Sequence, residues 1–139
     1  MKQKFSRSLL AVVAAAAIVL APSSDGAYAA DCKGILATPP DGLIVLSGEE
    51  LRTKVIGHTV EADEWSVYYA PDGNSYGTRP ATGSSWGGEW AICGSVLDLK
   101  WESGTERQRF IVVKGGRISY YTLDGELKGT FDLVKGKQF

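Results

Sequence analysis

The chain has 139 residues, of which 15 are Lys or Arg and 16 are Asp or Glu, so its net charge at neutral pH is −1. Three of the bases and one of the acids lie in the first 29 residues, so residues 30–139 carry 12 bases and 15 acids, a net charge of −3. A general nucleic-acid binder needs an excess of positive charge, because it must displace counterions from the phosphates. The charge therefore argues against nucleic acid as a partner, and the length predicts one domain.

The N-terminal residues 1–29 have the regions of a secretory signal peptide. The basic residues at its start are Lys2, Lys4 and Arg7. They precede thirteen consecutive apolar residues, Leu9–Ala21, a run shorter than the about 20 residues that a membrane-spanning helix needs. Small side chains at Ala27 and Ala29 indicate cleavage after Ala29. We expect residues 30–139 to form one periplasmic or secreted domain with no membrane span; the alternative is an uncleaved N-terminal anchor.

Two cysteines, Cys32 and Cys93, remain after this cleavage. An even number of cysteines in an exported chain favours a disulfide, which would attach the start of the mature domain to the middle of its sheet. One histidine and two bridged cysteines cannot supply the ligands of a zinc site, so we predict neither a metal nor a cofactor. Lipidation of Cys32 is not expected, because Asp31 stands where the attachment pattern has a small residue.

One short helix is predicted near the start of the mature chain. Ser47 and Glu50 have the spacing of a capping box, in which the two residues satisfy each other's backbone N–H groups. Leu51 and Val55 supply an apolar face at helical spacing, and Gly57 is placed to end the helix. The pattern predicts about two turns.

The other segments predict β-strands separated by turns. A short apolar strand is expected before the helix, at residues 43–46. The strands expected after the helix are Thr59–Ala62, Trp65–Ala70, Glu89–Cys93, Ser95–Glu102, Arg109–Lys114, Arg117–Leu123 and Leu127–Val134. Turns are predicted at Pro71–Asn74 and at Asp124–Gly125, a dipeptide favoured in two-residue hairpins. Seven or eight short strands without crossover helices predict a mainly β fold, either a small antiparallel up-and-down barrel or a sandwich.

A set of short motifs runs through residues 43–125. The motifs are Leu46–Leu51, Gly57–Thr59, Tyr68–Gly73 and Gly87–Trp90, followed by Cys93. They resemble a group of small exported bacterial proteins, found mainly in alphaproteobacteria, that is known only as a domain of unknown function. The resemblance implies a small lipocalin-like barrel and no particular activity. The group often has a second cysteine a dozen or more residues after Cys93, where this chain has Phe110, so here Cys32 must be the partner.

The glycine-rich segment 73–88 is the candidate binding surface. Five glycines, with serine and threonine between them, surround Tyr76, Arg79 and Trp86. Tyr, Arg and Trp dominate the energetic hot spots of protein interfaces. We therefore predict a binding loop at these three residues. The alternative is a pair of strands with a flexible connection, in which Trp86 only covers the end of the barrel.

The large aromatic residues of the predicted strands alternate as core residues do. They are Trp65, Tyr69, Trp90, Trp101 and Tyr120. A ligand cavity inside the barrel requires that these and the other inward side chains do not fill the interior.

No catalytic constellation is evident in the sequence. His58 is the only histidine and has no nucleophile motif beside it, so we interpret it as structural or superficial. The carboxylates that a hydrolase would have to bring together are Glu61, Asp63, Glu89 and Asp98. We predict a monomeric, non-enzymatic binding protein for a small apolar or amphipathic ligand inside the barrel, or for an envelope protein at residues 73–88. The alternatives are an inhibitor of an envelope or host hydrolase and a carboxylate-based envelope hydrolase.

Overall fold

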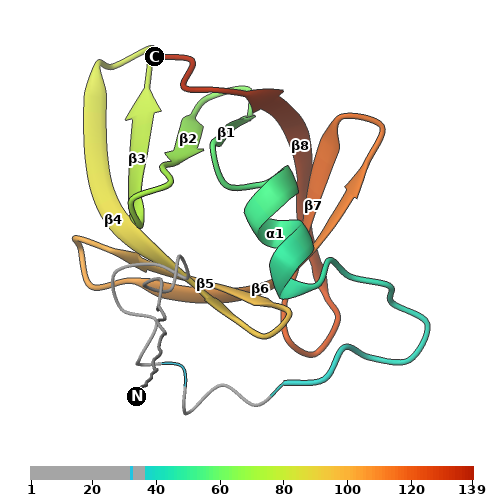
Figure 1. The fold of residues 1–139 in the computed structure, drawn as a ribbon. Helices are drawn as coiled ribbons and strands as arrows, with labels where there is room; N and C mark the ends of the chain where they lie inside the picture. The colour runs from blue at the N-terminus through green and yellow to red at the C-terminus, as the bar shows by residue number, and fades with distance from the viewer. Residues whose placement is uncertain (1–31, 33–36) are drawn as a thin grey trace, which may run out of the picture.

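The structure, a computed structural model, describes residue 32 and residues 37–139. The predicted signal peptide and its cleavage site lie outside these residues. The described chain contains one α-helix and eight β-strands (Figure 1). They are α1 (Gly48–Lys54), β1 (His58–Glu61), β2 (Ser66–Tyr69), β3 (Asn74–Arg79), β4 (Ser84–Cys93), β5 (Val96–Trp101), β6 (Glu106–Lys114), β7 (Arg117–Tyr121) and β8 (Leu127–Lys135). No helix within this part of the chain has the length and apolar character needed to cross a bilayer.

The eight strands form one closed antiparallel barrel, in which every strand pairs with its neighbours along the chain. The barrel closes between β1 and β8, where Val60 lies opposite Leu133. Because each connection joins adjacent antiparallel strands, the loops β1–β2, β3–β4, β5–β6 and β7–β8 gather at one end of the barrel. The predicted up-and-down barrel is confirmed over the sandwich, and its closure removes the exposed sheet edges that make small β proteins prone to aggregation.

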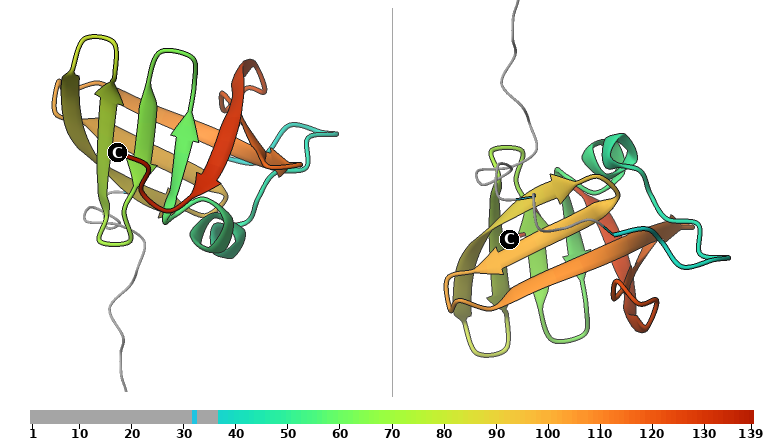
Figure 2. Two further views of the ribbon diagram at one scale, coloured as in Figure 1. Left: turned by 90° about the horizontal axis from the view of Figure 1, so that it is seen from above. Right: turned by 90° about the horizontal axis from the view of Figure 1, so that it is seen from below.

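Helix α1 lies at the other end of the barrel, where β1 begins (Figure 2). The predicted capping box is present: the Ser47 hydroxyl accepts from the Glu50 N–H, and the Glu50 carboxylate accepts from the Ser47 N–H at 2.9 Å. Leu51 and Val55 are fully buried and join the cluster that fills the barrel interior. The helix ends at Lys54, and the chain then turns into β1 through Gly57, whose φ of 84° favours glycine. Thus α1 closes this end of the barrel.

The inner core follows the alternation expected of strands. Trp90 and Tyr69 are the largest fully buried side chains that face inward, and Tyr120 is buried beside them. The Trp90 indole N–H donates to the carbonyl of Ala70 at 2.7 Å, which satisfies its one polar group. The prediction of core positions is therefore confirmed for these three aromatic residues.

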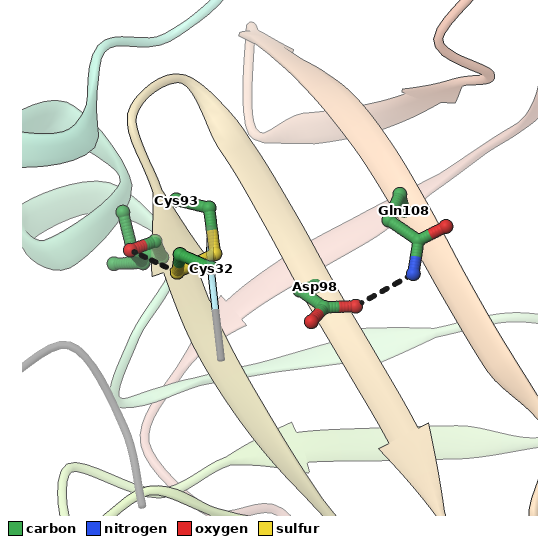
Figure 3. The surroundings of a disulfide bond; sticks show 5 residues. Cys32, Cys93, Asp98 and Gln108 are labelled. Atoms are coloured by element: carbon green, nitrogen blue, oxygen red, sulfur yellow. Dashed lines mark hydrogen bonds between the residues drawn. A yellow bond between two sulfur atoms is a disulfide. The ribbon is translucent and has the colours of Figure 1, made fainter. Parts of the chain in front are cut away.

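A second apolar cluster lies on the outer side of β4, β5 and β6. Its buried members are Ala91, Cys93, Val96 and Phe110, packed against Cys32 and the segment before α1. Cys32 and Cys93 form the predicted disulfide, with their Cα atoms 5.4 Å apart (Figure 3). On the same outer face, the Gln108 amide donates to the Asp98 carboxylate at 2.8 Å. The disulfide therefore ties the N-terminal part of the domain to the outside of the barrel.

The predicted strand at residues 43–46 is wrong. The Leu46 N–H donates to the Ile111 carbonyl at 2.8 Å, but the segment forms no strand and Ile44 is 88% exposed. Leu46 packs in the inner cluster and Val45 in the outer one. The apolar residues thus anchor a passing segment to two clusters instead of extending the sheet.

Two predicted connections also differ from the structure. Residues 73–88 are not mainly a loop, because β3 and β4 occupy most of this segment and only residues 80–83 join them. The alternative of a strand pair is therefore correct. Asp124–Gly125 is part of a five-residue loop, residues 122–126, in which the Thr122 N–H donates to the Glu126 carbonyl. The loop is longer than the two-residue turn that the dipeptide favours.

Candidate functional site

A cavity of about 390 Å³ opens at the barrel end opposite α1. This volume lies within the range of about 300–1,000 Å³ that is typical of small-molecule sites. Six aromatic side chains line it: Trp65, Tyr69, Trp86, Trp101, Tyr120 and Phe131. Four basic side chains do so as well: Arg79, Arg107, Arg109 and Lys128. No carboxylate of the described chain is among the lining residues, so the cavity is both aromatic and positively charged.

Glycines in β3 and β4 make room for two of the rings. Gly77 lies opposite Trp86, and Gly88 lies opposite Trp101. A Cβ atom at Gly77 would overlap the Trp86 indole, and one at Gly88 would lie 2.7 Å from the Trp101 ring. Both indoles therefore lie across the glycine of the neighbouring strand, along the wall of the barrel. Both indoles are among the side chains that line the cavity.

The rings form two groups on opposite sides of the cavity. Trp86 and Trp101, on β4 and β5, have ring centroids 6.4 Å apart with an edge-on orientation. Trp65, just before β2, packs on Phe131 of β8 with centroids 4.9 Å apart. The Phe131 ring in turn lies over Gly129, where a Cβ would come within 2.5 Å of it. In the order of strands around the barrel, these two groups face each other across the cavity.

Two tyrosine hydroxyl groups meet at the inner part of the wall. The Tyr69 and Tyr120 oxygens are 2.8 Å apart and form a hydrogen bond in which one hydroxyl donates to the other. Burial raises the pKa of Tyr69 to about 12 and raises that of Tyr120 well above its usual value. Ser75, in register with Tyr69 on β3, is also buried, and its hydroxyl has no hydrogen-bond partner among the described residues. The interior therefore contains polar groups with spare hydrogen-bonding capacity.

Two arginines extend from β6 into the cavity. Arg107 and Arg109 lie opposite Leu99 and Leu97 of β5, on the inner face. Each guanidinium donates to the carbonyl of the residue before it, and neither forms an ion pair with the part of the chain that the structure describes. Partial burial and the neighbouring Arg107 charge lower the pKa of Arg109, yet an arginine remains charged at physiological pH. Most of the N–H donors of both groups are thus available to a ligand.

The other two cations each lie near another group of the described chain. The Arg79 guanidinium lies 5.8 Å from the centroid of the Trp86 ring, a distance suited to a cation–π contact. Lys128 lies near Asp124, whose pKa is lowered mainly by the Thr122 hydroxyl and also by the Lys128 charge. Arg107 and Arg109 therefore differ from them in having no such partner within the described chain.

The structure separates the three residues of the predicted binding loop. Arg79 and Trp86 line the cavity. Tyr76 lies on the outer face of β3, 38% exposed, with the Lys137 ammonium 5.1 Å from its ring centroid. The predicted site is therefore divided between the inside and the outside of the barrel wall.

Other site residues were missed or misplaced by the sequence interpretation. Trp65 and Trp101 were predicted as core residues, but they are only partly buried and line the cavity. Arg107 and Arg109 were not singled out at all. They could be identified because Arg107, Arg109 and Ile111 are spaced two residues apart, so that they share one face of the strand, and Ile111 is fully buried. Charged residues that continue an inward-facing series indicate an interior that is open to solvent.

The candidate catalytic groups lie elsewhere. Glu61, Glu89 and Asp98 are on the outer faces of β1, β4 and β5, out of step with the inward residues of those strands. His58 has its Nδ1 atom 3.2 Å from the Ile56 carbonyl oxygen. Within the described residues, no three His, Cys, Asp or Glu side chains gather in a way that suits a metal ion.

No model of a protein family matches this chain, and comparisons with curated proteins and with solved structures found no similar protein. The resemblance to the exported bacterial group therefore stays a prediction. The assignment of a site rests on the geometry of the cavity.

Proposed function

We propose that this protein is an exported binding protein that holds a small amphipathic molecule inside its barrel, in the periplasm or outside the cell. The observation that carries this proposal is the open cavity of about 390 Å³ between two groups of aromatic rings. The disulfide supports the oxidising compartment, because such bonds persist mainly in exported proteins.

The construction of the wall favours ligand binding over simple packing. A small barrel normally fills its interior with side chains. Here Gly77 and Gly88 let the indoles of Trp86 and Trp101 lie along the wall, and the rings present apolar faces to the cavity. A ligand with an apolar body would bury those faces, which are otherwise wetted, and gain the hydrophobic free energy of that contact.

Binding of a partner protein through Tyr76, Arg79 and Trp86 is less well supported. The three residues would have to act on one surface, whereas Tyr76 is outside the barrel and Trp86 is within the cavity. We therefore place the ligand inside the barrel.

A neutral fluorescent probe tests this proposal without involving charge. Residues 30–139, purified with the disulfide intact, are titrated with N-phenyl-1-naphthylamine, whose emission rises in apolar surroundings. We expect saturable binding to the wild type. Val67→Phe should abolish it, because Val67 lines the cavity and a phenyl ring there would occupy the space.

The matched control is Tyr76→Ala, which removes an aromatic ring from the outer face and should leave binding unchanged. Near-ultraviolet circular dichroism verifies that each variant is folded. Equal binding by the wild type and Val67→Phe, or no binding by the folded wild type, would contradict the proposal.

A further inference from the structure

We infer that the ligand of this cavity is a small organic anion, whose acid group binds Arg107 and Arg109 while its apolar body lies between the aromatic groups. The inference rests on the proposed function and adds the chemical class of the ligand.

Strand β6 carries a pair of positive charges that no carboxylate of the described chain compensates. Arg107 and Arg109 are two residues apart on one face of a strand, so their side chains are neighbours of like charge. Both line the cavity, and within the described chain neither has a carboxylate partner. A fold that only needed to be stable would gain nothing from two such charges beside an apolar wall. A bound anion would neutralise them.

The donors of the two arginines have a geometry that suits an acid group. A guanidinium offers parallel N–H groups that match the two oxygens of a carboxylate or the oxygens of a sulfonate or phosphate. Each of these two arginines uses one nitrogen for the carbonyl of the preceding residue. That bond holds the group against its own strand and leaves its other donors free. Two guanidinium groups on one face of the strand, both lining the cavity, can bind one oxyanion together.

The tyrosine pair supplies a further polar group in the cavity wall. The charge of Arg109 acts on both Tyr69 and Tyr120, and it favours their ionised forms against the larger effect of burial. Arg109 and both tyrosines line the same cavity. Because one hydroxyl donates to the other, one of the two O–H hydrogens has no partner within the pair. It provides a neutral donor for an acid group that reaches this depth.

The charge of the cavity differs in sign from that of the domain as a whole. Residues 30–139 carry a net charge of −3, yet the residues that line the cavity include four cations and no carboxylate of the described chain. A cleft lined by one sign of charge attracts ligands of the opposite sign and raises their local concentration. The cavity thus combines apolar rings with a local excess of positive charge.

Two naphthalene probes that differ by one acid group test the inference. 8-Anilinonaphthalene-1-sulfonate is the sulfonated counterpart of the neutral N-phenyl-1-naphthylamine. We expect the wild type to bind the sulfonate at least about tenfold more tightly, since hydrogen bonds to charged groups contribute about a factor of ten or more in affinity. Naphthalene-2-carboxylate should displace the sulfonate, and the neutral naphthalene-2-carboxamide should not at the same concentration.

Variants then locate the acid group. Arg107→Gln and Arg109→Gln should each weaken binding of the sulfonate about tenfold and change binding of the neutral probe less than twofold. Arg109→Lys should lie between wild type and Arg109→Gln, because it keeps the charge and loses the fork. The matched control is Arg117→Gln, which removes one arginine charge from the outer face of β7. There the Arg117 Nε atom lies 3.5 Å from the Asp132 Oδ1 atom. This variant should leave both affinities unchanged.

The outcomes separate this inference from the proposed function. If the neutral probe binds but Arg109→Gln and Arg107→Gln bind the sulfonate as tightly as the wild type, the anion site is wrong and the apolar cavity stands. If the folded wild type binds neither probe, both proposals fail. Should the variants not fold, the ionic-strength dependence of the wild type decides: salt should weaken binding of the sulfonate and not of the neutral probe, and equal sensitivity would overturn the inference.

Discussion

The buried tyrosine pair allows a quantitative test of how the inner wall is held together. Tyr69 and Tyr120 are 51 residues apart in the sequence, both buried, with their hydroxyl oxygens 2.8 Å apart. Replacing either one with phenylalanine keeps the ring but leaves the other hydroxyl buried without its partner. Such an orphaned group costs about 1–3 kcal/mol, whereas the hydrogen bond itself contributes about 0.5–1.5 kcal/mol net.

We expect Tyr69→Phe and Tyr120→Phe each to lower the free energy of unfolding by about 1–2 kcal/mol. The double variant removes both hydroxyls and leaves no orphan, so its loss should not exceed that of either single variant. The resulting coupling energy is about 1–2 kcal/mol, within the range of contacting pairs. Urea denaturation of residues 30–139, followed by tryptophan fluorescence, measures the free energy of unfolding of the wild type, the two single variants and the double variant.

Additive losses would refute this reasoning, because they would mean that each hydroxyl has a separate partner. Tyr68→Phe is the control, since Tyr68 points to the outer face of β2. Its loss should stay within about 0.5 kcal/mol, as for other surface substitutions.

Three further predictions concern stability. Reduction of the Cys32–Cys93 disulfide, which spans 61 residues, should lower the free energy of unfolding by about 4 kcal/mol through chain entropy, and an unchanged urea midpoint would contradict this. The Tyr69 pKa is about 12 in the folded protein and about 10 in the unfolded chain, so the folded state favours the neutral hydroxyl. The contribution of this preference to the free energy of unfolding is complete below pH 10. It declines by about 1.4 kcal/mol per pH unit from pH 10 to pH 12. Urea unfolding at stepped alkaline pH measures this decline, which Tyr69→Phe should make less steep by removing the Tyr69 contribution and leaving that of Tyr120, whose pKa is also raised by burial. Gly77→Ala should displace the Trp86 ring and cost about 1–3 kcal/mol, with a changed tryptophan emission; wild-type stability would show that the ring has room to move.

The barrel itself could be predicted because its signals are local. Alternation of apolar residues and the turn dipeptides mark strands at short range, and the Ser47–Glu50 capping box marks the helix within one turn. The barrel closes by pairing β1 with β8, which are far apart in the sequence. No local sequence pattern distinguishes a closed barrel from a sandwich. It was therefore predicted only as one of two alternatives.

Two of the three residues predicted for the binding loop, Arg79 and Trp86, line the cavity, whereas Tyr76 does not, and binding by any of them stays a prediction. Glycine was the source of the error. A glycine-rich segment is typical of a loop, but Gly77 is in a strand, where the absence of a Cβ makes room for an indole from the neighbouring strand. That role depends on the register of β3 against β4, which the sequence of either strand alone does not specify.

The two arginines of β6 were missed for a related reason. An alternating pattern with charges at every second position is usually interpreted as an outer face. Here Arg107 and Arg109 share the inner face with the buried Ile111. The inward side chains of β6 thus change along the strand, from the buried core at Ile111 to the cavity wall at Arg109 and Arg107. The sequence does not show where this change occurs, because it depends on where the cavity opens.

The indole N–H signals of the four tryptophans in a two-dimensional NMR spectrum test the central claim most directly. Trp65, Trp86 and Trp101 line the cavity. Trp90 is buried in the barrel core, does not line the cavity, and donates its indole N–H to the Ala70 carbonyl. Titration with 8-anilinonaphthalene-1-sulfonate should shift the first three signals and leave that of Trp90 in place. If the probe binds without moving the three cavity signals, the ligand site is not inside the barrel.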